Sequence, residues 1–506
     1  MTCIKPHLGN MPADVRIHAP APYPYGSPKN VNAMSFLRLC ALSLCLAGTA
    51  QAATFSVGPS GCTHTTLDAA LDAAAATAGG PHLVKVAIAS QLVASDSLTD
   101  LLTLTHPLAD IDVVGGYANC AADTPGAGRS TIGLVDEAGQ LGRVMRIDNS
   151  GARRTITLRK LALVNARATG FPLPNAYGGG VRVAGNIDLI LDDVDIRKNR
   201  AVRGGGIAVL NGATVELRGH SAVSANTAES TSGMGGGIYC NGVGSEVRLA
   251  TVQILGNHSS GNGGAIHLDQ CALLSSVDDN QGGLSALNFQ NNTAGDGTAG
   301  PNSGDGGAIY SNATPIHLNG ASNTEHHVWF YNNSARNGGA IYYDNGSGSA
   351  RQVLIESPLF AYNTAHAKGG AIHARNEVFL WIGHNKTTPC AFTGEFAGSP
   401  VTVKGCSLLL GNRSANAGAA TTAGGGVVHM DYSGGIPANP PQLWIEKSTL
   451  RFNQDTGTAA VVHAYHAQVN VLNSILADNT AGGNAANPSA LLRLPDGLFR
   501  ILAARM

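Results

Sequence analysis

The sequence is poor in charged residues and, beyond residue 52, in long apolar runs. Only 13% of the 506 residues are Asp, Glu, Lys or Arg, and the formal net charge is −1. A basic surface is therefore not expected, and we predict no nucleic-acid partner. Because no later apolar run could span a bilayer as a helix, we also expect no transmembrane helix in the mature chain.

Metal-binding cysteine motifs are also missing. After residue 52 the sequence has six cysteines and no Cys-x-x-Cys, so disulfides are favoured over a metal site. Many pairings are open, but Cys240 and Cys271 follow successive repeats, and stacked strands lie about 4.8 Å apart, within disulfide reach. The pairs that we expect are Cys62–Cys120, Cys240–Cys271 and Cys390–Cys406.

A repeat dominates what is present. Between Gly178 and Val462, small residues, mostly glycine, are followed nine times by a β-branched residue, at intervals of 26 to 55 residues. Such periods are typical of stacked units that bury their apolar faces against one another. The copies begin at Gly178, Gly204, Gly235, Gly263, Gly306, Gly338, Gly369, Gly424 and Thr458.

An apolar-x-x-Asn pattern precedes most copies of the glycine motif. Asparagine tolerates a left-handed backbone and bonds its own turn, so it indicates a recurring corner. Stacked corners would align the side-chain amides in a ladder. The asparagines are Asn199, Asn226, Asn257, Asn292, Asn333, Asn363, Asn412 and Asn453.

Between these marks the pattern is that of short strands. The unit from Gly306 has apolar runs at Ala308–Tyr310, Pro315–Leu318 and His327–Tyr331, bounded by turn-forming residues. Three strands and three turns in about 30 residues predict one coil of a parallel β-helix. Long amphipathic helices are missing from the repeats, which argues against a helical solenoid. A β-propeller is the main rival, but its blades are longer, at about 40–45 residues.

A capping helix is predicted before the coils. Residues 65–76 have an amphipathic pattern, and Thr65 with Asp68 resembles a capping box. Such a helix would close the open end of the apolar core. We therefore predict an all-β solenoid over residues 53–480 with one short N-terminal helix. Residues 481–506 break the repeat and are expected to form a tail, truncated or amphipathic.

Residues 34–52 have the pattern of a signal peptide. Arg38 is followed by an apolar stretch, and Ala50-Gln51-Ala52 fits a cleavage site. Because residues 1–33 have no place before a secretory signal, we expect Met34 to be the true start and the preceding segment to be a mis-assigned extension. Export also agrees with the expected disulfides.

The repeats carry a family resemblance. Gly-Gly-Ala-Ile paired with Phe-x-x-Asn resembles the repeats of polymorphic outer membrane proteins from chlamydial surfaces. Val57–Cys62 followed by Thr66–Leu71 resembles the N-terminal cap of right-handed β-helix proteins of the pectin lyase-like class. The two resemblances span residues 54–480. They imply a right-handed parallel β-helix fold. They also imply display at the cell surface, a role in adhesion, and export as the passenger domain of an autotransporter. The family's C-terminal translocator is not recognisable, so an autotransporter-like passenger without its translocator is one expectation.

Aromatic residues and histidines follow the glycine motifs. Strand alternation turns them away from the core, and stacking would align them in a strip. Three interpretations are open: a stabilising ladder of rings, a glycan-contacting strip, or a metal-binding or pH-sensing row. Because no carboxylate recurs beside the imidazoles in the repeat pattern, we assign no metal site. The residues are Tyr239, His267, Tyr310, Tyr342, His373, His429 and His463.

Catalysis has one candidate cluster. Enzymes of the pectin lyase-like class use clustered acids with a nearby base, and here Asp192, Asp193 and Asp195 precede Arg197. Asp193 and Asp195 are expected on the same face of a strand, where they could bind Ca²⁺ if the chain were a lyase. The Gly-His-Gly and Arg-Ile-Lys motifs of polygalacturonases are missing. We therefore assign no catalytic residue and no cofactor.

The function that we predict is non-catalytic. The chain is expected to be secreted or held at a bacterial cell surface, for example at the outer membrane. Its expected role is adhesive, structural or glycan-contacting. Its partners would be a polysaccharide or a protein of a neighbouring or host cell surface. A polysaccharide lyase or glycoside hydrolase is the alternative. Fold alone does not decide between them.

Overall fold

The computed structural model describes most of the chain after residue 51. The described residues are 52–173, 175–230, 233–276, 286–295, 304–319, 328–346, 351–383, 391–396, 399–404, 407–415, 424–432, 440–456, 461–481, 492–494 and 498–502. For 391–396, 399–404, 493 and 498–502 this is the backbone alone. Most of the predicted signal peptide, Cys390 and Cys406 lie outside the described residues.

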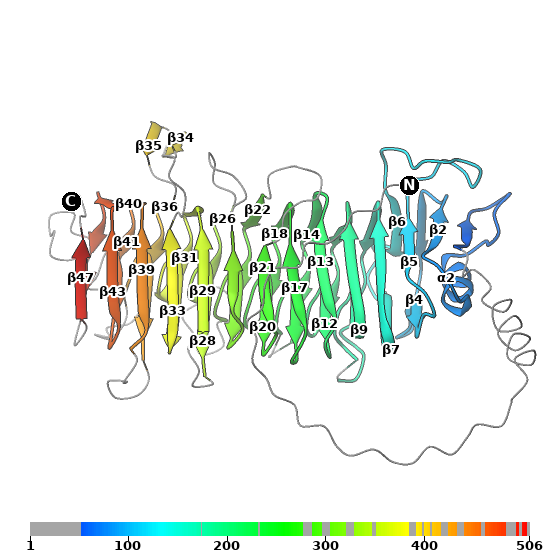
Figure 1. The fold of residues 1–506 in the computed structure, drawn as a ribbon, viewed down its shortest axis with the longest axis horizontal. Coiled ribbons are helices and arrows are strands. Elements are labelled where there is room, and N and C mark those ends of the chain that lie inside the picture. The colour runs from blue at the N-terminus through cyan, green and yellow to red at the C-terminus, as the bar shows by residue number, and fades with distance from the viewer. Residues whose placement is uncertain are drawn as a thin grey trace, which may run out of the picture. The chain divides into compact units, whose positions relative to one another are not determined.

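The coil from Gly306 shows how the repeat folds. Its strands are β24 (Ile309–Asn312), β25 (Ile316–Leu318), β26 (Val328–Tyr331) and β27 (Ser334–Asn337). Each pairs in parallel with its counterpart in the next coil, so that Ile309 lies beside Ile341 and Phe330 beside Phe360. Figure 1 shows the coils following one another along one axis. The predicted right-handed parallel β-helix is confirmed.

Sheet A takes two strands from each coil. Among the described residues it has 24 strands. Besides β24 and β25 they are β1 (Thr54–Val57), β2 (His82–Val86), β4 (Asp100–Thr105), β5 (Ile111–Val114), β7 (Arg143–Arg159), β9 (Val181–Asp192), β12 (Ile207–Leu210), β13 (Thr214–Arg218), β16 (Ile238–Asn241), β17 (Glu246–Leu249), β20 (Ile266–Asp269), β21 (Leu273–Ser276), β28 (Ile341–Asn345), β29 (Arg351–Glu356), β32 (Ile372–Asn376), β33 (Val378–Gly383), β38 (Val428–Asp431), β39 (Gln442–Glu446), β42 (Val462–Ala464), β43 (Gln468–Leu472), β46 (Leu492–Arg493) and β47 (Leu498–Leu502).

Sheets B and C take one strand each from a coil, 12 and nine strands in the described part of the chain. Sheet B comprises β26 with β3 (Ser90–Val93), β6 (Ser130–Leu134), β8 (Leu161–Val164), β10 (Asp195–Arg197), β14 (Ser221–Ser224), β18 (Val252–Leu255), β22 (Leu287–Gln290), β30 (Pro358–Ala361), β36 (Ser407–Leu410), β40 (Ser448–Arg451) and β44 (Ile475–Ala477). Sheet C comprises β27 with β11 (Arg200–Ala201), β15 (Thr227–Ala228), β19 (His258–Ser259), β23 (Thr293–Ala294), β31 (Thr364–Lys368), β37 (Arg413–Ser414), β41 (Gln454–Asp455) and β45 (Thr480–Ala481). An antiparallel hairpin, β34 (Ala391–Phe396) and β35 (Ser399–Lys404), stands apart from these sheets.

The N-terminal helix is where the sequence predicts it. Helix α2 (Leu67–Ala76) buries Leu67, Leu71 and two alanines against the first strands. Its N-cap is Thr66, whose hydroxyl accepts from the backbone of Ala69, so the expected cap at Thr65 is wrong by one residue. Asp68 does not close a capping box, because its carboxylate accepts from the backbone of Thr103. Among the described residues, the model contains no helix of a length and hydropathy that would cross a membrane.

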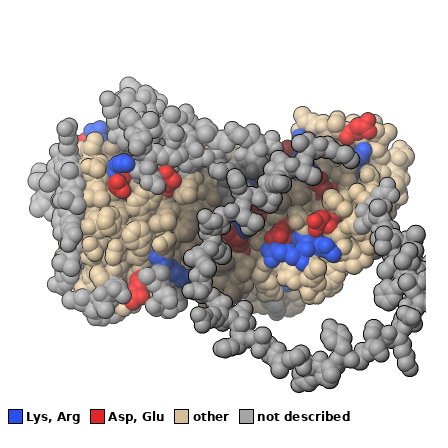
Figure 2. Space-filling model, in the orientation of Figure 1, with Lys and Arg blue, Asp and Glu red and all other residues tan. Residues whose placement is uncertain are grey.

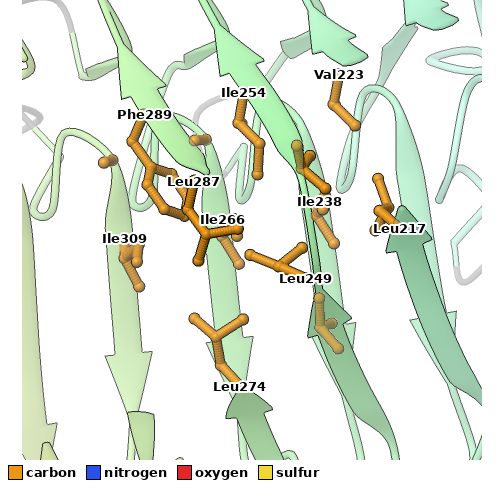
Figure 3. Packing of buried hydrophobic residues seen from close by; sticks show 14 of the residues in the cluster. Leu217, Val223, Ile238, Leu249, Ile254, Ile266, Leu274, Leu287, Phe289 and Ile309 are labelled. Carbon is orange, nitrogen blue, oxygen red and sulfur yellow. The ribbon is translucent and has the colours of Figure 1, made fainter. Parts of the chain in front are cut away.

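The core fills the space inside the coils. Figure 3 shows Val223, Ile254 and Phe289 of sheet B pointing toward the isoleucines of sheet A. Phe289, Phe330 and Phe360 stack in successive coils, with ring centroids 4.8 and 4.6 Å apart. Each coil therefore buries its apolar face against its neighbours, which is what makes a single coil unstable alone.

The first two glycines of each motif serve different needs. Gly306 has a φ of +71°, a left-handed backbone that favours glycine. Gly307 lies so close to the next coil that a Cβ would be 2.1 Å from the carbonyl oxygen of Gly339. The third position faces inward at Ala308, where a methyl group is buried. The sequence Gly-Gly-Ala is thus explained residue by residue.

Two details of the repeat differ from the sequence expectation. The left-handed residue at the second corner is the one before the ladder asparagine: Asn332, for example, has a φ of +52° and precedes Asn333. The asparagine itself turns its amide toward the stack. In the last coils Val428 and Val462, rather than the residues before them, lie in register with Ile372. Before Val428, the turn glycine that corresponds to Gly369 is Gly425, one residue later than expected.

Parallel pairing continues past residue 480. Strand β46 pairs with β42, and β47 pairs with β43 from Gln468–Leu498 to Leu472–Leu502. Part of the segment expected to form a tail therefore extends sheet A.

Candidate functional site

The predicted ring residues form one continuous row on sheet A. We call Tyr239, His267, Tyr310, Tyr342, His373, His429 and His463 the ring row. Neighbouring ring centroids are 4.6 to 5.5 Å apart along the whole row. The strand register produces this row, since each ring is paired in parallel with the next.

Six members of the ring row are buried and Tyr310 is partly exposed, whereas an exposed strip was expected. Its rings point away from the main core, yet Tyr239, His373 and His429 are only 1 to 2% exposed. Where the structure describes it, chain at or before the glycine motif lies beside some of these rings. The Arg203 guanidinium lies 5.3 Å from the Tyr239 ring centroid, and the Gly424 carbonyl lies 3.1 Å from Nδ1 of His429. Strand alternation alone could not reveal this cover.

Burial sets the protonation of the row. Desolvation lowers the pKa of His267 and His429 to about 4, and it raises the pKa of Tyr310 to about 12. The imidazoles of His267 and His429 are therefore neutral near pH 7. Because most of these rings are covered, a sugar could not stack on the row from solvent.

A carboxylate does lie beside two imidazoles, which the sequence interpretation missed. Asp431 follows His429 by two residues on the same face of β38, and its Oδ2 is 3.3 Å from Nε2 of His373 and 3.5 Å from Nε2 of His429. Lys368 and Arg375 also contact this carboxylate.

The four candidate catalytic residues lie around the turn between β9 and β10. Asp192 ends β9, Asp193 has a left-handed backbone in the turn, and Asp195 begins β10. Burial raises the pKa of Asp195, opposed by nearby arginines. Each carboxylate has its own arginine, in the pairs Asp192–Arg218 at 3.3 Å, Asp193–Arg129 at 2.6 Å and Asp195–Arg197 at 3.2 Å.

The ladder asparagines are buried in one hydrogen-bonded column. The Nδ2 of Asn333 donates to Oδ1 of Asn363 at 3.0 Å and to the Phe289 carbonyl at 2.9 Å. The Oδ1 of Asn333 accepts from both the backbone N–H and the side-chain Nδ2 of Asn292. The same pattern runs from Asn199 to Asn479. The column satisfies buried polar groups at every corner.

Two expected disulfides are present. Cys62 is bonded to Cys120, and Cys240 to Cys271, which joins the first strand of one coil to the bend after the first strand of the next. The third expected pair lies outside the described residues. These crosslinks tie the cap to the first coils and one coil to the next.

A second aromatic row lies on the outer face of sheet A, and we call Leu354, Phe379, Trp381 and Trp444 the tryptophan platform. Leu354, Trp381 and Trp444 are in register on β29, β33 and β39. All four are partly exposed, and they alternate with core residues such as Leu380. The platform was missed because the sequence interpretation followed the glycine motif; the alternation Phe379-Leu-Trp381 carried the signal.

Amide side chains border the platform. Gln352 is exposed in register with Phe379, and Gln442 follows on β39. The Gln442 Oε1 accepts from Nε1 of Trp444 at 3.3 Å, and the Phe379 and Trp444 ring centroids are 6.4 Å apart. Figure 2 shows charged side chains gathered over the coils around β7 and β9, with a broad area of few charges nearer the C-terminal coils. The arrangement is an apolar aromatic surface with amides beside it.

Two shallow hollows, each of about 500 Å³, lie elsewhere on the coils. The first is lined by Asp136, Lys198 and Arg200, whose charges are paired: Lys198 with Asp136 at 2.7 Å and Arg200 with Glu229 at 2.7 Å. The second adjoins Cys271 at the bend between the two strands that each coil gives to sheet A.

Fold and surface define a solenoid protein of the parallel β-helix class, with a buried asparagine ladder and an aromatic row on the outer face of sheet A. Four segments of the chain, 251–269, 286–312, 330–344 and 359–375, match the Chlamydia polymorphic membrane protein repeat. The chain thus carries repeats of this type, as the resemblance predicts. No curated protein and no solved structure gives a match.

Proposed function

We propose that this protein is a non-catalytic β-helix protein of the cell surface, secreted or associated with the outer membrane, that contacts carbohydrate through the tryptophan platform. The observation that carries the proposal is the partly exposed row of Trp381, Trp444 and their neighbours on a regular sheet face. The long stack of coils serves as a rigid support for that face.

The surface location is supported by three independent features. The repeat matched by the chain is named for a membrane protein. Two disulfides join residues of the coils, and such bonds persist in oxidising compartments outside the cytosol. The predicted signal peptide, residues 34–52, agrees with export.

Sugar stacking explains the chemistry of the platform. One face of a pyranose ring is rich in C–H groups and packs on an indole or phenyl ring, while its hydroxyls need donors and acceptors at the edge. Trp381 and Trp444 supply the rings, and Gln352 and Gln442 supply amides beside them. Glu356 and Glu446 lie on the same face two residues after Leu354 and Trp444, and their negative charge favours a neutral polysaccharide over a strongly acidic one.

A binding role is favoured over hydrolysis or elimination. A general acid or base must present a free proton or lone pair to the substrate. The carboxylates of Asp192, Asp193 and Asp195 are each engaged by an arginine instead. Ca²⁺-dependent lyase chemistry would have to displace these ion pairs first.

The test is retention of the protein on immobilised polysaccharides, neutral and acidic, combined with a product screen in Ca²⁺. We expect retention on a neutral polysaccharide and no released oligosaccharides by mass spectrometry. Trp381→Ala with Trp444→Ala should weaken retention about tenfold or more, since each stacked ring contributes roughly 1 kcal/mol.

The matched control is Trp329→Ala, because Trp329 is 41% exposed on sheet B, away from the platform. Its retention should equal that of the unmodified protein. Equal weakening by all three tryptophan changes would contradict a localised site. Release of oligosaccharides, lost on changing Asp195→Asn, would replace the binding role with catalysis.

A further inference from the structure

Three ligand-type atoms converge within the ring row between β32 and β38. Nε2 of His373 and Nε2 of His429 lie 3.3 and 3.5 Å from the same Oδ2 of Asp431, and all three atoms lie within 4.8 Å of one another. Around a tetrahedral zinc ion with bonds of about 2.0–2.1 Å, neighbouring ligand atoms are about 3.3 Å apart. Two of the three separations already match this spacing.

The orientation of His429 is fixed by its second nitrogen. Nδ1 lies 3.1 Å from the Gly424 carbonyl oxygen, which can only accept, so Nδ1 carries the hydrogen. The neutral ring then presents the lone pair of Nε2 to a carboxylate oxygen, and two acceptors face each other. An Nε2–H on His373 could satisfy its own contact with Oδ2 but not the contact at His429, whereas a metal ion accepts lone pairs from all three atoms. A backbone carbonyl on the far nitrogen is a common support for a metal-binding histidine.

Lys368 and Arg375 hold the carboxylate in different ways. Nζ of Lys368 lies 2.7 Å from Oδ2, the oxygen that both imidazoles approach, and its side chain is 25% exposed. Nε of Arg375 lies 3.1 Å from the other oxygen, Oδ1. An incoming ion can therefore displace the lysine into solvent while the arginine keeps the carboxylate in place. Lys368 is a built-in competitor for the metal position.

We infer that His373, His429 and Asp431 form a site for a divalent transition-metal ion of the zinc class, with Lys368 competing for it. Two imidazoles and one carboxylate are a donor set that binds Zn²⁺, Co²⁺, Ni²⁺ and Cu²⁺, whereas Mg²⁺ and Ca²⁺ prefer oxygen ligands. Three protein ligands leave a fourth position for water. The site lies apart from the tryptophan platform, and it does not depend on carbohydrate binding.

The test is a Zn²⁺ titration of the metal-stripped protein against a colorimetric chelator. We expect one equivalent to bind, and Co²⁺ in its place should give the intense visible absorption of tetrahedral coordination. His373→Gln and His429→Gln should each weaken binding at least about tenfold, by loss of one of three ligands. Lys368→Met should strengthen binding severalfold, since the competing ammonium is gone.

His267→Gln is the matched control, because His267 is an equally buried member of the ring row three coils away. It should bind Zn²⁺ as the unmodified protein does. Thermal unfolding of each variant shows whether the fold persists. If a histidine variant does not fold, the Zn²⁺ affinity of Lys368→Met and the Co²⁺ spectrum of the unmodified protein still test whether the site binds metal. No Zn²⁺ uptake, octahedral Co²⁺, or unchanged affinity in both histidine variants and in Lys368→Met would overturn the site.

Discussion

At the residue scale, the asparagine ladder is the most demanding feature of the fold. Each amide in the column both donates and accepts, and the side chains are buried. A buried polar group left without its partner costs about 1–3 kcal/mol. One changed residue therefore disturbs the two corners next to it as well as its own.

Asn333→Asp should destabilise the protein by about 3 kcal/mol or more near pH 7. An ionised carboxylate cannot donate, and it would face Oδ1 of Asn363 and the Phe289 carbonyl, two other acceptors. Urea unfolding measures the loss. The control is Asn332→Asp, an exposed neighbour with a left-handed backbone that aspartate tolerates. Equal stability of the two variants would contradict the ladder.

His267 makes stability depend on pH in a defined window. Burial lowers its pKa to about 4, against about 6.5 in the unfolded chain. The unfolded state therefore takes up a proton first as the pH falls. Its contribution to stability is complete above about pH 6.5, and roughly 3 kcal/mol is lost between pH 6.5 and pH 4.

His267→Tyr should remove that dependence without disturbing the stack, because Tyr239 and Tyr310 hold the same position in the coils on either side. The free energy of unfolding is measured against pH for both proteins. The variant should lose less stability between pH 6.5 and pH 4. Parallel profiles would show that His267 is not buried as described.

The sequence predicts which residues occupy these positions but not how they are covered. The spacing of Asn333 and Asn363 from their glycine motifs is enough to place both in a ladder. The burial of His429 depends on chain outside its strand, such as the Gly424 carbonyl, which no periodicity reports. Asp431 was overlooked for a related reason: its importance appears only when His373 from the preceding coil is brought beside it.

At the element scale, the glycine turn is where one coil meets the next. Gly306 supplies a left-handed backbone, and Gly307 supplies close contact with the next carbonyl. Because the two glycines meet different needs, substitutions at them should fail for different reasons. The intervals between motifs vary, since additional residues are accommodated outside this turn.

Gly307→Val should disrupt its coil and cost at least about 3 kcal/mol. Its Cβ would lie 2.1 Å from the Gly339 carbonyl oxygen and 2.6 Å from the Ser334 amide nitrogen, and neither backbone atom can move freely. Thermal and urea unfolding measure the effect. Gly128→Ala is the control, since a Cβ there would meet nothing within 4 Å. Native stability of the Gly307 variant would contradict the turn.

Strand positions could be predicted to within one or two residues. The apolar run Ala308–Tyr310 corresponds to β24, and Pro315–Leu318 to β25. The register of Val428 was misplaced by one residue because Val427 and Val428 are both β-branched, which leaves two ways to align the motif. The N-cap is Thr66 and not the predicted Thr65, because the sequence cannot distinguish two adjacent threonines that differ only in backbone geometry.

At the scale of the whole molecule, crosslinks add to the stacking of coils. Cys240 and Cys271 are 31 residues apart and belong to successive coils. In the chain-entropy account, closing a loop of this size restricts the unfolded chain and contributes about 3–4 kcal/mol. The stacked core stabilises the folded state, whereas this bond acts mainly on the unfolded state.

Replacing both Cys240 and Cys271 by Ala should lower the free energy of unfolding by roughly 3 kcal/mol under non-reducing conditions. The folded coils should keep their far-ultraviolet circular dichroism. Adding a reductant should bring the unmodified protein close to the variant, apart from the effect of the Cys62–Cys120 bond. Equal stability of variant and unmodified protein without reductant would show that the bond is not formed.

The overall architecture could be predicted because repetition multiplies a weak signal across many coils. The tryptophan platform could not, because it depends on the mutual register of β29, β33 and β39, whose separations in the chain are irregular. Trp381 and Trp444 are distant in sequence and unrelated to the glycine motif. Only the stacked structure places them on one face.

The most direct test of the platform is tryptophan fluorescence, because the chain has only three tryptophans. Trp329→Phe leaves Trp381 and Trp444 as the sole emitters. Titration of this variant with neutral oligosaccharides should shift or quench the emission in a saturable way. The double variant Trp381→Phe/Trp444→Phe, which emits from Trp329 alone, should show no change. A saturable response confined to Trp329, or no response in either variant to any neutral or acidic oligosaccharide, would contradict carbohydrate binding at the platform.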